Sequence, residues 1–375
     1  MTNKELFYFT GKCLTLDEHP GFRHEIIEKC QADRIVWEQF VFLCSNHLIL
    51  PVIYLKFKTH QILEYLPEDL SEHLKEIYEL NVTRNNLILK QLQQIVNVLN
   101  ESNIQPVFLK GSGNLLDGVY SNIGERILGD IDFLVPEKDY LLSAKLMEDA
   151  GYSKTGNVQI GIDLATMKHY PRLMHPEFVA TIEIHRIPVP ENYLKRYNST
   201  IIDQEKKLVE SIPGCFILSE KHKIIHNFIH SQLSNKSHEY GIVSFRDIYD
   251  LYLFSKRYQI KETLPHIQNK RMAIAYFAFA DQVFGLSGKF YPSGNLSSWF
   301  LLKKHTLNLN SGKFYRIHRS FIFLRWQIVS KYFGQITEAF YSKKIRQSLL
   351  RRLGNRHWYK THLDWYKGFF TQKHN

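Results

Sequence analysis

Apolar residues recur at helical spacing through most of the first hundred residues. The clearest series predicts one long amphipathic helix, which begins after Pro67 and ends at the polar cluster 100–103. Its apolar positions lie mostly three or four residues apart and include Leu74, Ile77, Leu80, Ile88, Leu92, Ile95 and Leu99. We therefore expect a helical N-terminal part over residues 1–100.

Short alternating runs replace this pattern after Gln105. In one of them, Ile131, Phe133 and Val135 alternate with two acids and a leucine, as in a strand with one apolar face. The predicted elements are strands over 106–109, 130–135, 169–174 and 179–187, and a helix over 138–150 that ends at Gly151. This order predicts a small core with a mixed sheet over residues 101–190.

Helical spacing returns after Pro190, most clearly over residues 221–233 and 245–256. We expect a helical part over 191–300 and a basic helical segment over 301–375. The predicted class is α+β: a small mixed sheet with helices, flanked by helical N- and C-terminal parts.

Composition and cysteine spacing favour a globular cytoplasmic protein. The 375 residues, 44% of them hydrophobic, suffice to bury a sizeable core. The four cysteines, at 13, 30, 44 and 215, have neither metal-ligating nor disulfide-framework spacing, which is typical of a reducing compartment. The first residues lack the basic and apolar regions of a signal peptide, and no run of about 18 apolar residues predicts a transmembrane helix.

The charge of the chain is unevenly distributed. Residues 301–375 contain 16 Lys and Arg against two acids, Glu338 and Asp364, a balance of +14; the net charge of +11 therefore leaves −3 for the first 300 residues. This asymmetry predicts an anionic partner: nucleic acid, a phosphorylated acceptor or a membrane surface. The cations and aromatics concerned include Arg346, Arg351, Arg352, Arg356, Trp358, Tyr359, Trp365 and Tyr366. The alternative is a solvated helix face with aromatics in a core.

Two acids occupy alternate positions of the second predicted strand. Asp130 and Asp132 share a strand face, about 7 Å apart along the backbone, and can converge on a divalent cation that relieves their repulsion. An Asp-x-Asp triplet also arises by chance in a chain of this length, but the apolar alternation around it favours a site. Glu183 shares a face with His185 on a later predicted strand. Three carboxylates on adjacent strands favour a two-metal site for phosphoryl chemistry.

A glycine-containing turn follows the first predicted strand. Gly111 lets the backbone approach a phosphate closely, and N–H groups at a helix start favour anions. Lys110 and Ser112 add a positive charge and a hydroxyl donor. The alternative is an ordinary strand-to-helix turn, and the residue order excludes a Walker A loop.

Together these motifs resemble the nucleotidyltransferase superfamily with the DNA polymerase β-like fold. More narrowly, the chain resembles a poorly characterised bacterial nucleotidyltransferase-like family over roughly residues 40–255. The matching segments are 81–99, 108–111, Arg126 with Asp130-Ile131-Asp132, 182–185 and 246–250. Seventeen residues separate Ser112 from Asp130, which is longer than the usual gap in the superfamily.

The resemblance implies a nucleotidyltransferase that moves a nucleoside monophosphate from an NTP, such as ATP, to an unidentified acceptor. Asp130 and Asp132 would bind both metal ions, Mg²⁺ or Mn²⁺, and Glu183 the catalytic one. Gly111 and Ser112 would hold the triphosphate.

Several polar residues leave two interpretations open. Arg126 would contact a phosphate or pair with Glu125 or Asp130. His185 would hold a carboxylate in place or simply end a strand, and the second interpretation is favoured. Arg246 is expected to pair with a neighbouring acid on a helix. The helical series His222, His226 and His230 has no cysteine or acid partner that would indicate a metal site.

Two other functions compete with nucleotidyl transfer. An Asp-x-Asp glycosyltransferase would also bind a metal ion, but such enzymes usually begin with a strand-rich half rather than with helices. A non-catalytic binding or antitoxin-like protein would keep the fold without turnover. Retention of all three carboxylates argues against it, and an absence of metal-dependent NTP binding would favour it.

Overall fold

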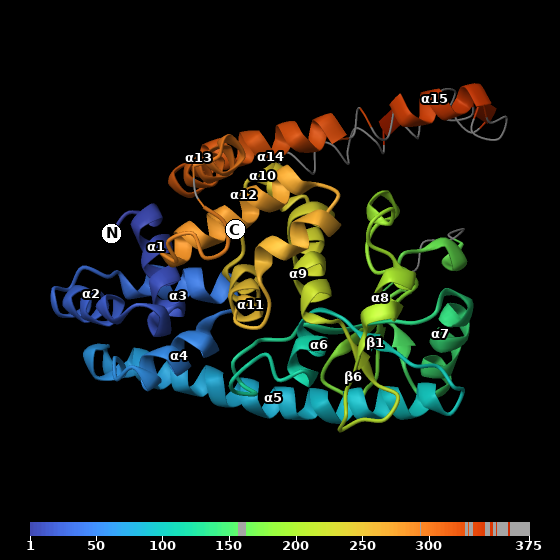
Figure 1. Cartoon of the computed structure of the whole chain (residues 1–375), viewed down its shortest axis with the longest axis horizontal. Helices are drawn as coiled ribbons and strands as arrows, with labels where there is room; N and C mark the ends of the chain where they lie inside the picture. The colour runs from blue at the N-terminus through green and yellow to red at the C-terminus, as the bar shows by residue number, and fades with distance from the viewer. Residues whose placement is uncertain are drawn as a thin grey trace. The chain divides into compact units, whose positions relative to one another are not determined.

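A single helix of 33 residues, α5 (Glu68–Asn100), runs beneath both the N-terminal helices and the sheet (Figure 1). It begins directly after Pro67, whose fixed φ and missing N–H suit a helix start. Ile88, Leu92 and Ile95 are fully buried on the face toward the sheet. The long helix predicted from apolar spacing is confirmed at both ends.

The computed structural model describes residues 1–156, 163–292, 294–326, 329, 333–341, 346–347, 350 and 359–360. Contacts divide the chain into two units, Met1–Thr306 and Leu307–Asn375. Of the basic segment's predicted partner residues, Arg351, Arg352, Arg356, Trp358, Trp365 and Tyr366 lie outside the described residues.

Four α-helices precede α5. They are α1 (Asn3–Leu14), α2 (Pro20–Gln31), α3 (Trp37–Asn46) and α4 (Leu50–Thr59). Thr2 and Glu5 form a capping box that satisfies backbone donors at the start of α1. Phe7 on α1 stacks on Phe245, so this helix packs against the helical part that follows the sheet.

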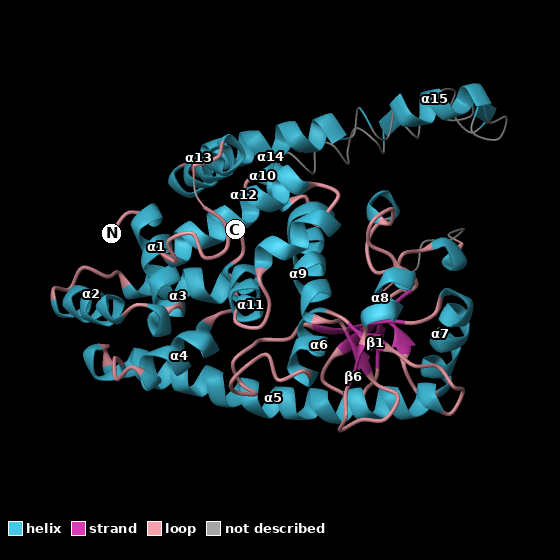
Figure 2. Ribbon diagram, viewed as in Figure 1, coloured by secondary structure: helices cyan, strands magenta, loops and turns pink. Residues whose placement is uncertain are grey.

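Seven short strands form one mixed sheet among the helices (Figure 2). They are β1 (Val107–Phe108), β2 (Asp130–Leu134), β3 (Ser153–Lys154), β4 (Leu173–Met174), β5 (Thr181–His185), β6 (Lys207–Leu208) and β7 (Phe216–Ile217), in the order β3-β4-β5-β2-β1-β7-β6. The neighbours β2 and β5 run parallel, as do β1 and β7, and the other pairs are antiparallel. This sheet confirms the α+β class. Two of its strands, β6 and β7, lie beyond the boundary at residue 190 predicted for the core.

The two central strands bury apolar side chains on one face of the sheet and carry polar side chains on the other. Ile131, Phe133, Ile182 and Ile184 are fully buried in the core that the sheet shares with α5 and α7 (Tyr140–Asp149). Because side chains alternate along a strand, the intervening acids share the opposite face.

The strand β1 leads directly into helix α6 (Lys110–Leu116). A Cβ atom on Gly113 would lie 2.5 Å from the backbone oxygen of Phe108, so a larger residue would push helix and strand apart. Lys110 begins the helix with φ +50°, a left-handed conformation that is strained for a residue with a side chain.

Further helices among the described residues come after β5, with α8 between β5 and β6 and the others after β7. They are α8 (Ser199–Glu205), α9 (Glu220–Phe228), the π-helix η6 (Ile229–Ser234), α10 (Ser237–Tyr240), α11 (Phe245–Ser255), α12 (Lys270–Phe284), α13 (Leu296–Asn310), α14 (Gly312–Trp326) and α15 (Gly334–Tyr341). The helix predicted over 221–233 therefore changes from α to π geometry after Phe228. Among the described residues, no helix is long and apolar enough to cross a membrane.

Candidate active site

The parallel pairing of β2 with β5 brings the predicted acids together. Asp132 is directly opposite Glu183, and Leu134 is opposite His185. Residues in register on neighbouring strands project to the same face, so Asp130, Asp132, Glu183 and His185 converge on one side of the sheet. Asp132 is almost fully buried, Glu183 is buried, and Asp130 is more exposed.

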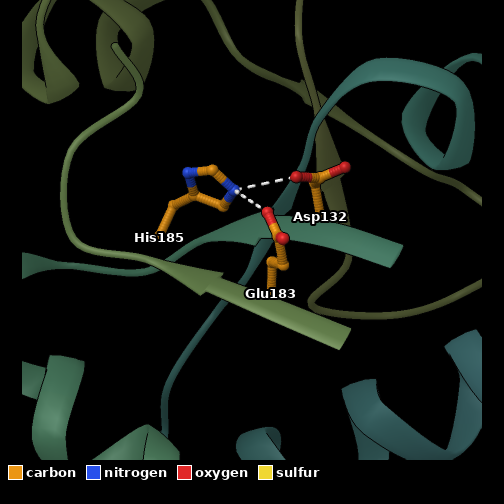
Figure 3. Close-up of side chains that lie close together, drawn as sticks. All are labelled: Asp132, Glu183 and His185. Carbon is orange, nitrogen blue, oxygen red and sulfur yellow. Dashed lines mark hydrogen bonds and ion pairs between the residues drawn. The ribbon is translucent and has the colours of Figure 1, made fainter. Parts of the chain in front are cut away.

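One ring nitrogen of His185 faces both buried carboxylates (Figure 3). Its Nε2 is 2.8 Å from Asp132 Oδ1 and 3.7 Å from Glu183 Oε2. One ligand atom from each of the three residues lies within 4.8 Å of the others. Carboxylate oxygens with an imidazole nitrogen form a donor set that suits a divalent metal ion. The sequence favoured a strand-ending role for His185 over holding a carboxylate in place, whereas in the structure its ring contacts the Asp132 carboxylate.

Two basic side chains face the same acids. Lys110 Nζ is 2.6 Å from Asp132 Oδ1. Arg172 Nη2 is 2.7 Å from Glu183 Oε1 and 3.0 Å from Asp130 Oδ2. Sequence reasoning assigned Lys110 to a phosphate and missed Arg172, which precedes β4 at the sheet surface. Arg172 lies two residues after Tyr170, inside the strand predicted over 169–174. Nothing in this strand pattern indicated that its side chain would contact two carboxylates.

The charges in this cluster shift the pKa values of its carboxyl groups in different directions. Burial opposes ionisation of Asp132, but Lys110 and His185 outweigh it and hold its pKa well below the usual range. His185 is the main cause that lowers the pKa of Glu183 to about 2. Burial and the charge of Asp132 raise the pKa of Asp130. Asp132 and Glu183 are therefore ionised at neutral pH, as metal ligands must be.

A cleft of about 350 Å³ opens onto the acids. Its lining residues are Lys110, Gly111, Arg126, Leu128, Gly129, Asp130, Asp132, Arg172, Glu183, His230, Asn235 and Arg246. Three arginines and a lysine thus surround the carboxylates in one open space. A cleft that combines acids with cations suits a ligand that carries both metal ions and phosphates.

Arg126 forms a buried ion pair with a distant acid. Its Nη2 and Nε donate to the Asp250 carboxylate at 3.0 and 3.1 Å, and Tyr120 donates to the same carboxylate. The partners expected from the sequence were Glu125, Asp130 or a phosphate, and Asp250 was not among them. Arg246 lies 3.6 Å from Asp247, as the favoured interpretation of a helix pair expects.

Packing contacts and a hydrogen bond restrict the glycine-containing turn more than its sequence indicates. Ser112 is buried, and its hydroxyl donates to the backbone oxygen of Leu109 at 2.9 Å. A Cβ atom on Gly111 would lie 2.4 Å from a methyl carbon of Leu128, so the turn is pressed against the loop that precedes β2. Gly111 lines the cleft, whereas the Ser112 side chain does not.

Buried amides of α5 hold the long connection between Ser112 and Asp130. Asn81 Nδ2 donates to the backbone oxygens of Gly124 and Arg126 at 2.8 and 3.1 Å. Asn85 Nδ2 also donates to the oxygen of Arg126, at 2.9 Å. These asparagines were missed as site-supporting residues, although polar side chains on the apolar face of the long helix were a visible signal.

In the histidine series on the helix after β7, His222 and His226 are buried and His230 is half-buried, and His222 Nε2 lies 3.4 Å from Glu205 Oε2. His226 Nε2 lies 3.3 Å from the oxygen of Pro188, and the rings of His226 and His230 stack at 6.1 Å. Burial lowers the pKa of His226 to about 3, so this ring is neutral at physiological pH. His230 borders the cleft, but within the described part of the chain the metal-ligating cluster is the one at Asp132.

Comparison with known proteins identifies a family model that matches most of the chain. A family model described as uncharacterised nucleotidyltransferase matches residues 33–291. No curated protein shows significant similarity. The crystal structure of JHP933 from Helicobacter pylori is 16% identical over 66% of this chain and 98% of that chain, with a TM-score of 0.31, too low to support any argument.

Proposed function

The chain belongs to this family of uncharacterised nucleotidyltransferases, and from that membership we propose that it transfers a nucleoside monophosphate from an NTP to an acceptor. The observation that carries the proposal is the register of β2 and β5, which sets Asp132 beside Glu183 at the floor of a cationic cleft. Family membership also favours nucleotidyl transfer over the glycosyltransferase alternative.

The donor set supports a metal-dependent reaction. Asp130, Asp132 and Glu183 would hold Mg²⁺ or Mn²⁺, and His185 offers a further nitrogen ligand or orients Asp132. When bound, the metal supplies positive charge at the phosphate and lowers the pKa of the acceptor hydroxyl. His185 and Arg172 lower the pKa of Glu183 and keep its carboxylate ionised, so we assign it to cation binding.

Cationic side chains of the cleft are suited to the triphosphate. Lys110, Arg172 and Arg246 reach the cleft from three different segments of the chain, and Gly111 borders the same cleft. Arg126 is engaged by Asp250, so we assign it to shaping the wall and adding positive potential. The Ser112 hydroxyl donates to the backbone oxygen of Leu109. We therefore assign Ser112 to holding the backbone of this turn in place rather than to direct contact with the triphosphate.

Label transfer tests the proposal directly. The full chain would be incubated with Mg²⁺ or Mn²⁺ and each NTP, labelled at the α- or the γ-phosphate, with and without cell extract. We expect α-label, but not γ-label, on an acceptor that mass spectrometry then identifies. Asp132→Asn should abolish the transfer, whereas the matched control Lys154→Gln, which breaks an ion pair with Glu148 outside the site, should retain it.

The non-catalytic alternative predicts a different result. A binding or antitoxin-like protein would give no label transfer with any NTP, although it folds with a cooperative transition. Absence of metal-dependent NTP binding as well as of transfer would contradict the proposal.

A further inference from the structure

The second unit exposes apolar side chains at helical spacing. On α14, Ile317 and Phe321 are 60% and 65% exposed, and Leu324 is 40% exposed. The spacing i, i+4, i+7 places these three residues, the apolar stripe, on one helix face. On α15, Ile336 and Phe340 are also exposed and repeat the i, i+4 spacing.

Cations accompany the apolar stripe on the same helix. Lys313, Arg316 and Arg325 are exposed, and α14 contains no acid. At 100° per residue, Arg316 and Arg325 lie on opposite flanks of the stripe. The helix thus presents an apolar centre with positive edges.

We propose that α14 docks on an anionic phospholipid surface. The aliphatic and phenyl side chains of Ile317, Phe321 and Leu324 would enter the boundary between headgroups and acyl chains, where their burial is favourable. The flanking arginines would pair with lipid phosphates while their stems lie along the apolar layer.

Charge and side-chain chemistry favour an anionic membrane over two other partners, a second copy of the chain and a nucleic acid. Residues 307–375 carry 14 Lys and Arg against two acids, so stripes from two copies of the chain would repel one another. A nucleic acid would pair with the cations, but stacking on bases requires planar groups, which Ile317 and Leu324 lack. An anionic membrane satisfies both the cations and the aliphatic side chains.

Vesicle flotation of the full chain tests the proposal. Vesicles of phosphatidylcholine alone are compared with vesicles that also contain phosphatidylglycerol. We expect binding only to the anionic vesicles, weakened by salt. The triple substitution Ile317→Ser, Phe321→Ser, Leu324→Ser should reduce the binding about tenfold or more, because hydrocarbon burial is lost while every cation remains.

Two controls keep the result interpretable. Phe42→Ser on α3, which removes an equally exposed phenyl group from the other unit, should leave vesicle binding unchanged. Both variants should unfold at the temperature of the parent, since the substituted side chains are exposed. The proposal is overturned by absence of binding to anionic vesicles, by binding that the triple variant retains, or by self-association of the parent that the triple variant loses.

Discussion

The Arg172 guanidinium lies 2.7 Å from Glu183 Oε1, where it neutralises a carboxylate proposed to bind metal. The same nitrogen contacts Asp130, so one exposed arginine bridges two of the three acids. Arginine and a divalent cation therefore compete for these oxygens. An NTP that arrives with its metal would offer the arginine phosphate oxygens in exchange.

This competition predicts the behaviour of Arg172→Gln. Without nucleotide, the variant should bind Mn²⁺ about three- to fivefold more tightly than the parent, as expected for loss of a partly exposed ion pair. Its affinity for Mn²⁺·NTP should fall instead. Electron paramagnetic resonance of free Mn²⁺ measures the first effect and calorimetry the second; unchanged Mn²⁺ affinity without nucleotide would rule out the competition.

Asp130 and Asp132 should differ in their effect on stability. Asp132→Asn leaves the Lys110 ammonium beside a neutral amide in a buried setting, so we expect a loss of about 3 kcal/mol in unfolding free energy as well as loss of activity. Asp130→Asn removes a carboxylate whose pKa is raised by burial and by Asp132, so stability should be unchanged or slightly higher. Urea unfolding without metal tests both, and equal destabilisation by the two variants would contradict the assignment.

Glu183→Gln should separate substrate binding from turnover. The variant keeps Asp130 and Asp132, and should therefore still bind metal and NTP while label transfer falls about 100-fold or more. Equilibrium binding of NTP and single-turnover transfer measure the two effects. Full activity of Glu183→Gln would remove this carboxylate from the proposed site.

Buried histidines should make the fold sensitive to mild acid. Burial lowers the pKa of His47, His222 and His305 to about 4, from an ordinary value of 6.5. Between these values the unfolded chain binds more protons than the folded one, so stability falls as the pH drops below about 6.5. Urea unfolding across this range should show a positive slope of free energy with pH.

One variant measures the contribution of a single histidine to the slope of unfolding free energy with pH. His305→Asn keeps a donor for the backbone oxygen of Gly241, which lies 3.0 Å from His305 Nδ1, but cannot titrate. Its slope between pH 6.5 and 4 should be shallower than that of the parent. The matched control His73→Asn, at an exposed position, should leave the slope unchanged.

The buried pair of Arg126 and Asp250 should be required for stability as well as for the cleft. Asp250→Asn leaves the guanidinium buried without its counter-charge, which costs about 3–5 kcal/mol. Arg126→Lys should not restore stability, because lysine cannot make the two-pronged contact. If Arg126→Lys unfolds like the parent and only NTP affinity falls, then Arg126 acts on the nucleotide rather than through Asp250.

The local periodicity of apolar residues was sufficient to predict helix α5 and which residues share a face of each central strand. Helical spacing predicted α5, and strand alternation placed Asp130 with Asp132 on one face and Glu183 with His185 on another. These properties depend on neighbours within a few residues, which the sequence displays directly.

Tertiary structure decided which of these faces meet and which charges pair. The register that sets Asp132 opposite Glu183 comes from the pairing of strands about 50 residues apart in the chain, and Arg126 meets Asp250 across 124 residues. The sequence contains several acids with which a cation such as Lys110 or Arg172 could form an ion pair. Only the packing of the sheet against its helices selects the partner, because burial makes an unpaired charge costly.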